Sequence, residues 1–221
     1  MERTIKVTGT GRISVKPDQT IINLDFRKVL PTYDEALKAS AIDVSIIKNA
    51  LVECGIDKET LKTTRFDVDT HFHSHRDKDG NYQSEFNGYE YQQSLRFTFD
   101  VDNKLLGRVL YQLSQLPVMP EFRIHYGIKD SESAKNELLG NAIKDAKKKA
   151  EIISLAAGVQ LDEIVDINYS WLDIEFNTRS YGAYEDRLLC CKSKPTSGFD
   201  IDIEPEDIER SDNVTLVFKI K

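Results

Sequence analysis

The sequence has no long apolar run. None of its 221 residues belongs to a stretch approaching the roughly 20 consecutive apolar residues that cross a bilayer as a helix. The opening residues, Met1–Ile5, lead straight into an alternating strand pattern, without the basic and then apolar segments of a secretion leader. These absences predict a cytoplasmic protein with no membrane span.

Cysteine is scarce, and the sequence has no excess of positive charge. The three cysteines are Cys54, Cys190 and Cys191, an odd number with an adjacent pair, which indicates reduced thiols and no disulfide framework. Acidic residues outnumber basic ones by 37 to 30, giving a formal net charge of −7. Because phosphate contacts are made by Lys and Arg, this balance predicts no nucleic-acid partner.

What remains is the composition of a globular protein, with 40% hydrophobic and 30% charged residues. Between residues 18 and 128 the patterns follow in the order strand, helix, strand, strand, helix, strand. Thr32 and Glu35 form a capping box for the first helix, Gly55 ends it, and Asp102 caps the second. This order predicts a ferredoxin-like βαββαβ subdomain, an antiparallel sheet with two helices on one face.

A second subdomain is predicted from residues 1–17 and 129–221. Its main element is a helix from Asp130 to about Ala157, ended by Gly158, whose apolar stripe is mostly alanine and can lie close against a sheet. A strand from Ile164 to Phe176, a long loop over 177–200 and a closing alternating strand complete it. The fold class is therefore α+β, with two subdomains forming one domain, the second a small sheet covered by the long helix. The stripe comprises Ala134, Leu138, Ala142, Ala146, Ala150, Ile153 and Ala157.

Three segments together resemble the SIMPL-domain family. They are the opening strand with its spaced Gly9 and Gly11 and its Pro17-Asp18 turn, the alanine-rich helix that ends at Gly158, and the closing strand Asn213–Phe218. The resemblance covers nearly the whole chain. It implies a two-subdomain α+β fold, ring-like homo-oligomers in some members, and a role in partner binding or stress defence. It implies no catalytic residues and no cofactor.

The sharpest local feature is a run of three alternate histidines, His71, His73 and His75. In a strand they share one face at spacings of about 6.6 Å. Two of them could chelate Zn²⁺ or Ni²⁺, but a closed ligand set needs a donor from another element. The simpler interpretation is a solvated strand face, and the histidines are retained as the candidate metal site.

Other candidate chemistry is weaker. The pair Cys190-Cys191 has basic neighbours that could lower a thiol pKa, although an incidental pair of thiols explains it as well. Gly9-Thr-Gly11 lacks the helix and the Lys-Ser/Thr of a phosphate loop. Lys147-Lys148-Lys149 fits a solvated helix face. With no nucleophile elbow, and His125 lacking a partner defined by spacing, no enzyme is predicted.

The sequence therefore predicts a non-enzymatic, self-associating scaffold or partner-binding protein, with a homo-oligomer as its expected state. The first strand and the apolar final strand, Val214 to Ile220, are the strands expected to pair across subunits. The alternative is a metal- or redox-linked stress protein that uses the histidine strand or the cysteine pair.

Overall fold

The computed structural model describes residues 3–76, 82–169, 174–178, 181–182 and 203–221. The chain divides into two compact units, each with its own core. One comprises residues 19–126 and 179–204, and the other comprises residues 1–18, 127–178 and 205–221. In the described residues, no helix is long and apolar enough to cross a membrane.

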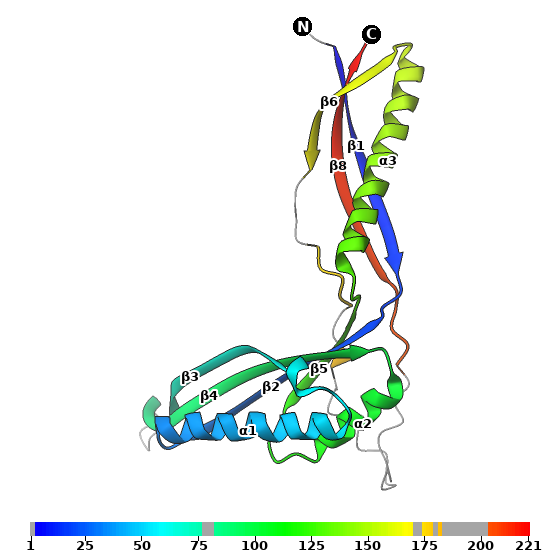
Figure 1. Ribbon diagram of the computed structural model, residues 1–221. Helices are drawn as coiled ribbons and strands as arrows, with labels where there is room; N and C mark the ends of the chain where they lie inside the picture. The colour runs from blue at the N-terminus through cyan, green and yellow to red at the C-terminus, as the bar shows by residue number, and fades with distance from the viewer. Residues whose placement is uncertain (1–2, 77–81, 170–173, 179–180, 183–202) are drawn as a thin grey trace. The chain divides into compact units, whose positions relative to one another are not determined.

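The first unit is the predicted ferredoxin-like subdomain. Its sheet has the strand order β3-β4-β2-β5-β7, with β3 at one edge, and Figure 1 shows helices α1 and α2 on one face. The pairs β2–β4, β3–β4 and β5–β7 are antiparallel. The elements are β2 (Gln19–Leu30), α1 (Tyr33–Glu53), β3 (Lys62–Arg76), β4 (Tyr82–Asp100), α2 (Asn103–Ser114), β5 (Glu121–Gly127) and β7 (Tyr181–Gly182), with a 3-10 turn at Lys58–Thr60.

The core of this unit follows from strand alternation. Alternate residues of β2 and β4 face the helices and are almost fully buried, while their neighbours form the opposite, open face. The capping box predicted at Thr32 and Glu35 is confirmed, since each side chain bonds the other's backbone N–H. Helix α1 ends with Gly55 at φ 88°, as predicted. The buried strand residues include Ile22, Leu24, Phe26, Tyr91, Leu95 and Phe97.

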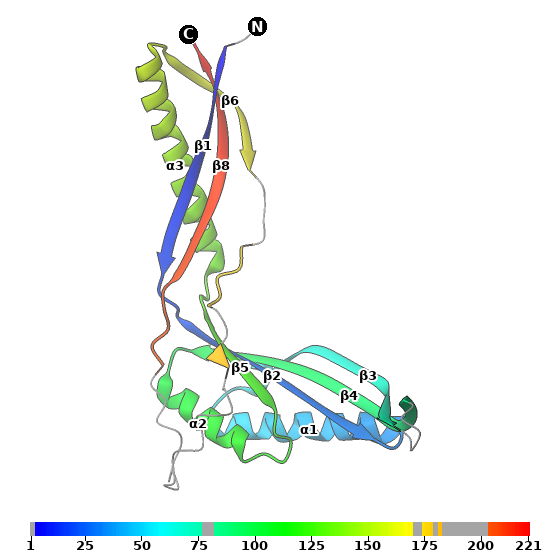
Figure 2. The same ribbon diagram turned by 180° about the vertical axis from the view of Figure 1, so that it is seen from behind.

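The second unit is a three-stranded sheet in the order β1-β8-β6, covered by α3. Figure 2 shows β8 lying between the other two strands. Helix α3 is capped by Asp130 and ended by Gly158 at φ 64°, as predicted. The elements are β1 (Thr4–Val15), α3 (Ser131–Ala157), β6 (Leu161–Tyr169) and β8 (Ile208–Ile220).

The small residues of α3 lie against β1 and β8, as the alanine stripe predicted. Ala142, Ala146 and Ala150 are fully buried. At its end the stripe differs from the prediction, because Ser154 is buried and Ile153 is 44% exposed. Buried positions every four residues drift by about 40° per step around a helix of 3.6 residues per turn. The line of buried residues along α3 therefore continues from Ala150 to Ser154, and Ile153 and Ala157 lie outside it.

Enlarging a buried alanine of α3 tests this contact. We expect Ala146→Leu to lower the free energy of unfolding by about 1–3 kcal/mol, because the added atoms overpack the helix against the sheet. Ala156→Leu is the matched control, an exposed alanine of the same helix that should change stability by less than about 0.5 kcal/mol. Denaturant unfolding measures both. Equal effects in the two variants would contradict the burial of the stripe.

Two predicted boundaries were wrong. Strand β6 begins at Leu161 and ends at Tyr169, short of the predicted end at Phe176, because Ile174 and Phe176 leave the sheet and Phe176 is buried beside α3 residues. The predicted loop 177–200 contains β7, which pairs with Arg123 and Ile124 of β5, so Tyr181 and Gly182 belong with the ferredoxin-like unit and not with the long-helix unit. Most of the remaining predicted loop lies outside the described residues.

Candidate functional site

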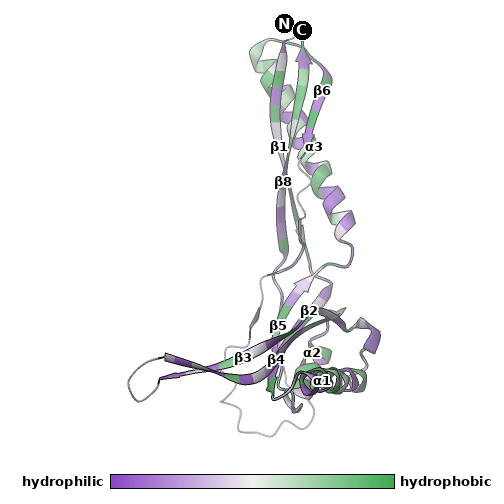
Figure 3. Ribbon diagram, turned by 90° about the vertical axis from the view of Figure 1, so that its left-hand side faces the viewer, coloured by the Kyte–Doolittle hydropathy of each residue, from purple (hydrophilic) through white to green (hydrophobic). Residues whose placement is uncertain are grey.

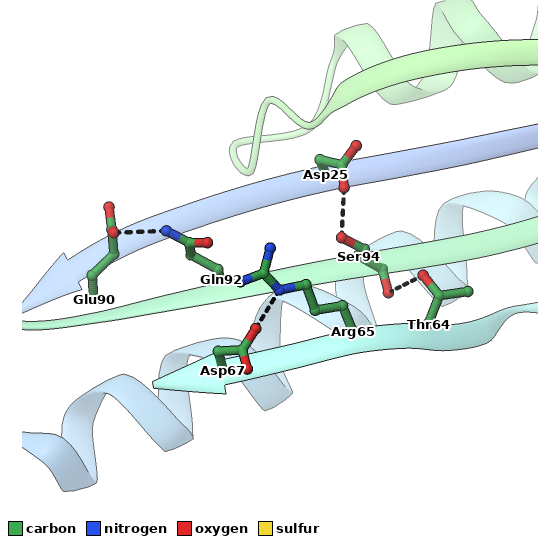
Figure 4. A network of polar contacts seen from close by, with 7 residues as sticks. All are labelled: Asp25, Thr64, Arg65, Asp67, Glu90, Gln92 and Ser94. Atoms are coloured by element: carbon green, nitrogen blue, oxygen red, sulfur yellow. Dashed lines mark hydrogen bonds and ion pairs between the residues drawn. The ribbon is translucent and has the colours of Figure 1, made fainter. Parts of the chain in front are cut away.

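The open face of the five-stranded sheet is polar. Figure 4 shows polar side chains of β2, β3 and β4 joined by hydrogen bonds and ion pairs, some between strands, as for Ser94 with Asp25, and some within one strand, as for Arg65 with Asp67. Asp25 accepts a hydrogen bond from the Ser94 hydroxyl at 2.5 Å and forms an ion pair with Arg123. On β3, Arg65 and Asp67 form a second pair. Charges on this face are thus largely matched by neighbours within the sheet.

A hollow of about 390 Å³ opens over this face. Its lining combines Asp25, Arg65, Gln92 and Ser94 with Met119, whose side chain is 80% exposed. Ser94 donates to Asp25, whose carboxylate also forms an ion pair with the Arg123 guanidinium. Among the described residues that line the hollow, none is a histidine. The polar side chains of this lining can form hydrogen bonds with a polar group.

The three predicted histidines lie near the C-terminal end of β3. Among the described strands, β3 has a strand partner on only one side. The His73 and His75 rings stack with centroids 6.1 Å apart, and His71 Nδ1 lies 3.3 Å from Asn87 Nδ2. Glu85 of β4 stands opposite His73. Within the described ranges no group of three His, Cys, Asp or Glu side chains could hold a metal ion. A metal site at the histidines stays a prediction.

The opposite face of the same strand pair carries exposed aromatic side chains. Phe72 and Phe86 are 52% and 53% exposed and meet edge to face, with ring centroids 5.9 Å apart. Tyr89 continues this contact to Phe86, and Tyr33 of α1 packs against Tyr89. Figure 3 shows β3 and β4 continuing beyond the helices. Alternation along β3 sets Phe72 on the face opposite the histidines, but it cannot show whether a helix covers the ring.

Neither of the two strands predicted to pair between subunits, β1 and β8, has a fully open edge. Strand β8 lies in the middle of its sheet, so the prediction of a free edge there was wrong. The outer edge of β1 is bonded by a row of α3 side chains: Asp145 accepts from Thr10 N–H at 2.7 Å, Lys149 donates to the Thr8 carbonyl, and Asn141 donates to the Arg12 carbonyl. These bonds close much of the β1 edge.

Asp145 and Lys149 also form an ion pair with each other at 2.7 Å. The hydrogen bond from Lys149, followed by that from the Thr10 N–H, holds the pKa of Asp145 below its ordinary value. Lys149 is therefore not part of a purely solvated lysine face, as the run Lys147–Lys149 had suggested. Neither partner could be assigned to the β1 edge from spacing within the helix alone.

Strand β6 forms the other edge of the three-stranded sheet. Three of its apolar side chains, Ile164, Val165 and Ile167, are 37%, 46% and 58% exposed. Among the described strands, β6 pairs only with β8. Both sheets thus end in a strand that has exposed apolar side chains and one unpaired side.

The cysteines offer no described reactive site. Cys190 and Cys191 lie outside the described residues. Cys54 is 7% exposed at the end of α1, and burial is the main cause that raises the pKa of its thiol. A buried thiol with a raised pKa is a poor nucleophile.

Comparison with known proteins places this architecture in context. A family model described as SIMPL, protein of unknown function (DUF541), matches residues 5–218. Two curated relatives, the 26 kDa periplasmic immunogenic proteins of Brucella abortus and Brucella melitensis, are each 28% identical over 166 residues. The match covers 74% of this chain and 65% of each relative.

A solved structure, the regulatory subunit of aspartate kinase from Thermus flavus, aligns over 97% of this chain and 89% of its own. The identity is 11% and the TM-score is 0.19, so this alignment does not indicate a shared fold.

Proposed function

Since the chain belongs to the SIMPL family, whose function is unknown, we propose that it is a non-enzymatic protein that self-associates or binds a partner protein through the unpaired edges of its sheets. The observation that supports this proposal is the pair of edge strands β3 and β6, each with exposed large apolar side chains. Unpaired edges of this kind attract further strands unless they are covered or charged.

The polar hollow supports a binding role over an enzymatic one. Two of its charged groups already have ion-pair partners, Asp25 with Arg123 and Arg65 with Asp67. The curated relatives are named as immunogenic proteins and not as enzymes. A role in stress defence remains an expectation drawn from the resemblance alone.

The cellular location can be tested by experiment. The odd number of cysteines, with an adjacent pair, predicts reduced thiols of the cytoplasm, whereas the relatives' names point to the periplasm. Fractionation of cells expressing the native gene distinguishes the two compartments.

Edge-blocking substitutions test the proposed association. We expect Phe72→Lys on β3, or Ile167→Lys on β6, to shift the light-scattering mass towards that of one chain, because a charged side chain at a strand edge opposes further pairing. Ile42→Lys on α1 is the control: Ile42 is 59% exposed, as Ile167 is 58% exposed, but it lies on a helix. Equal losses of mass in all three variants would contradict an edge interface.

Metal analysis separates the proposal from its rival. Protein purified without a histidine tag is expected to contain no stoichiometric zinc or nickel. Stoichiometric metal that is lost in a His71→Ala, His73→Ala double variant would favour the metal-linked function instead.

A further inference from the structure

The β3 edge has a pattern that is complementary to itself. Its open-face residues change along the strand from carboxylates, Asp67 and Asp69, to imidazoles, His71 and His73. An antiparallel copy of the same strand reverses this order. The carboxylates of one copy can therefore stand opposite the imidazoles of the other, whose ring N–H groups can donate to carboxylate oxygens.

Two antiparallel copies of β3 in one sheet are related by a two-fold axis perpendicular to that sheet, which keeps the open faces of both copies on the same side. Each possible register of the two strands can be named by the residue on this axis, which lies directly opposite the same residue of the other copy. A register centred on Asp67, Val68 or Asp69 places carboxylates directly opposite carboxylates, which is unfavourable. One centred on Phe72 places His71 opposite His73. One centred on His71 keeps two carboxylate–imidazole pairs, but it sets His71 opposite its own copy and Val68 opposite Ser74, so the apolar pair is lost.

The register centred on Thr70 avoids these conflicts. On the open face it pairs Asp67 with His73, and Asp69 with His71. On the helix-side face it pairs Val68 with Phe72 and Thr70 with itself. Aromatic–β-branched and Thr–Thr pairs are both favourable across antiparallel strands.

The available surface matches this register. Thr70 and Phe72 are exposed, and Val68 is half-buried. The β3–β4 pairing is irregular between Thr63 and Arg65, outside the proposed contact, and between His71 and Phe72, inside it. At the second point the unpaired residue is Asn87 of β4, so β3 itself has no insertion there. On β4, Glu90 faces Asp69 and Glu85 faces His73, so the neighbouring strand adds further acceptors beside the imidazoles and no cation that would repel them.

From this complementarity we infer that β3 is the contact between two copies of this chain, paired antiparallel about Thr70 into one continuous sheet. The inference rests on the proposed self-association and identifies its partner and register. In such a pair the helices of both copies lie on the same side of the joined sheet, and the exposed ring of Phe72 covers Val68 of the other copy.

Disulfide trapping tests the register. In a Cys190→Ser, Cys191→Ser background, Thr70→Cys brings two thiols to directly opposed positions, where the Cα separation of about 4.5–5.5 Å suits a disulfide. Mild oxidation should convert most of the protein to a covalent dimer on a non-reducing gel. Ser74→Cys is the control, an exposed residue on the same strand face whose two copies would lie about 27 Å apart. It should stay monomeric on the gel.

A mixed reaction gives a second readout. The Phe66→Cys and Ser74→Cys proteins should crosslink with each other, since the register places these positions opposite. Native-like thermal unfolding of each reduced variant confirms that it has folded. Comparable crosslinking of Thr70→Cys and Ser74→Cys would indicate random encounter and overturn the inference.

The failure of this inference is distinguishable from that of the proposed function. A light-scattering mass above one chain together with no Thr70→Cys dimer would overturn the β3 interface and leave association through another surface. A mass of one chain for the native protein would overturn both the β3 interface and the proposed self-association, and would leave only the binding of a different partner protein.

Discussion

Gly9→Val will lower the free energy of unfolding by at least about 3 kcal/mol, at the upper end of the cost of overpacking. A Cβ at Gly9 would lie 2.1 Å from the Ala142 carbonyl oxygen and 2.4 Å from the Ala146 backbone nitrogen. Both are backbone atoms within α3, so they cannot rotate away as a flexible side chain would. The helix would have to move off β1, which would also weaken the Asp145 bond to Thr10.

Gly140→Ala is the matched control for this prediction. Gly140 lies in α3, and a Cβ added there meets nothing within 4 Å. Replacing a helical glycine by alanine should raise stability by about 0.5–1 kcal/mol, because the unfolded chain loses freedom. Chemical denaturation of both variants is the measurement. A Gly9→Val cost below about 1 kcal/mol would show that α3 and β1 are not in this close contact.

Tyr91→Phe will destabilise the ferredoxin-like unit by about 1–3 kcal/mol, the cost of leaving a buried polar group without its partner. Tyr91 is 1% exposed, and its hydroxyl donates to a carboxylate oxygen of Asp43, itself 7% exposed, on α1. Burial, then the bond to Asp43, raises the pKa of Tyr91, so the phenol remains a donor throughout the neutral range. The variant removes that donor and leaves the carboxylate in the core.

Tyr82→Phe controls for loss of a hydroxyl as such. Tyr82 is 75% exposed, and its hydroxyl accepts a hydrogen bond from Arg76 at 2.8 Å. Since water can replace that partner, we expect a change within about 0.5 kcal/mol. Similar losses in the two variants, measured by urea unfolding, would contradict a special role for the Tyr91–Asp43 bond.

Much of the fold follows from local patterns in the sequence. Alternation in β2 and β4, together with the caps at Thr32 and Asp102, is enough to predict the order of the ferredoxin-like elements. The alanine stripe likewise predicts that α3 packs against a sheet. These signals depend only on residues that are close in the sequence, so they can be recognised without knowledge of the tertiary structure.

The features that matter for binding depend on contacts between distant segments. The polar hollow needs β2, β3 and β4 side by side, and the closed edge of β1 needs Asn141, Asp145 and Lys149 placed along it. Helical spacing shows that these three side chains share a face but not which strand they meet. Likewise, alternation cannot show that β8 is central or that the ring of Phe72 is exposed.

The most direct test of self-association is the mass of the native, untagged chain in solution. One chain weighs 25.3 kDa. Multi-angle light scattering at micromolar concentration, at low and at moderate salt, should give a mass of at least two chains that falls on dilution or on introduction of Phe72→Lys. A mass of 25.3 kDa under every condition would contradict the proposed self-association.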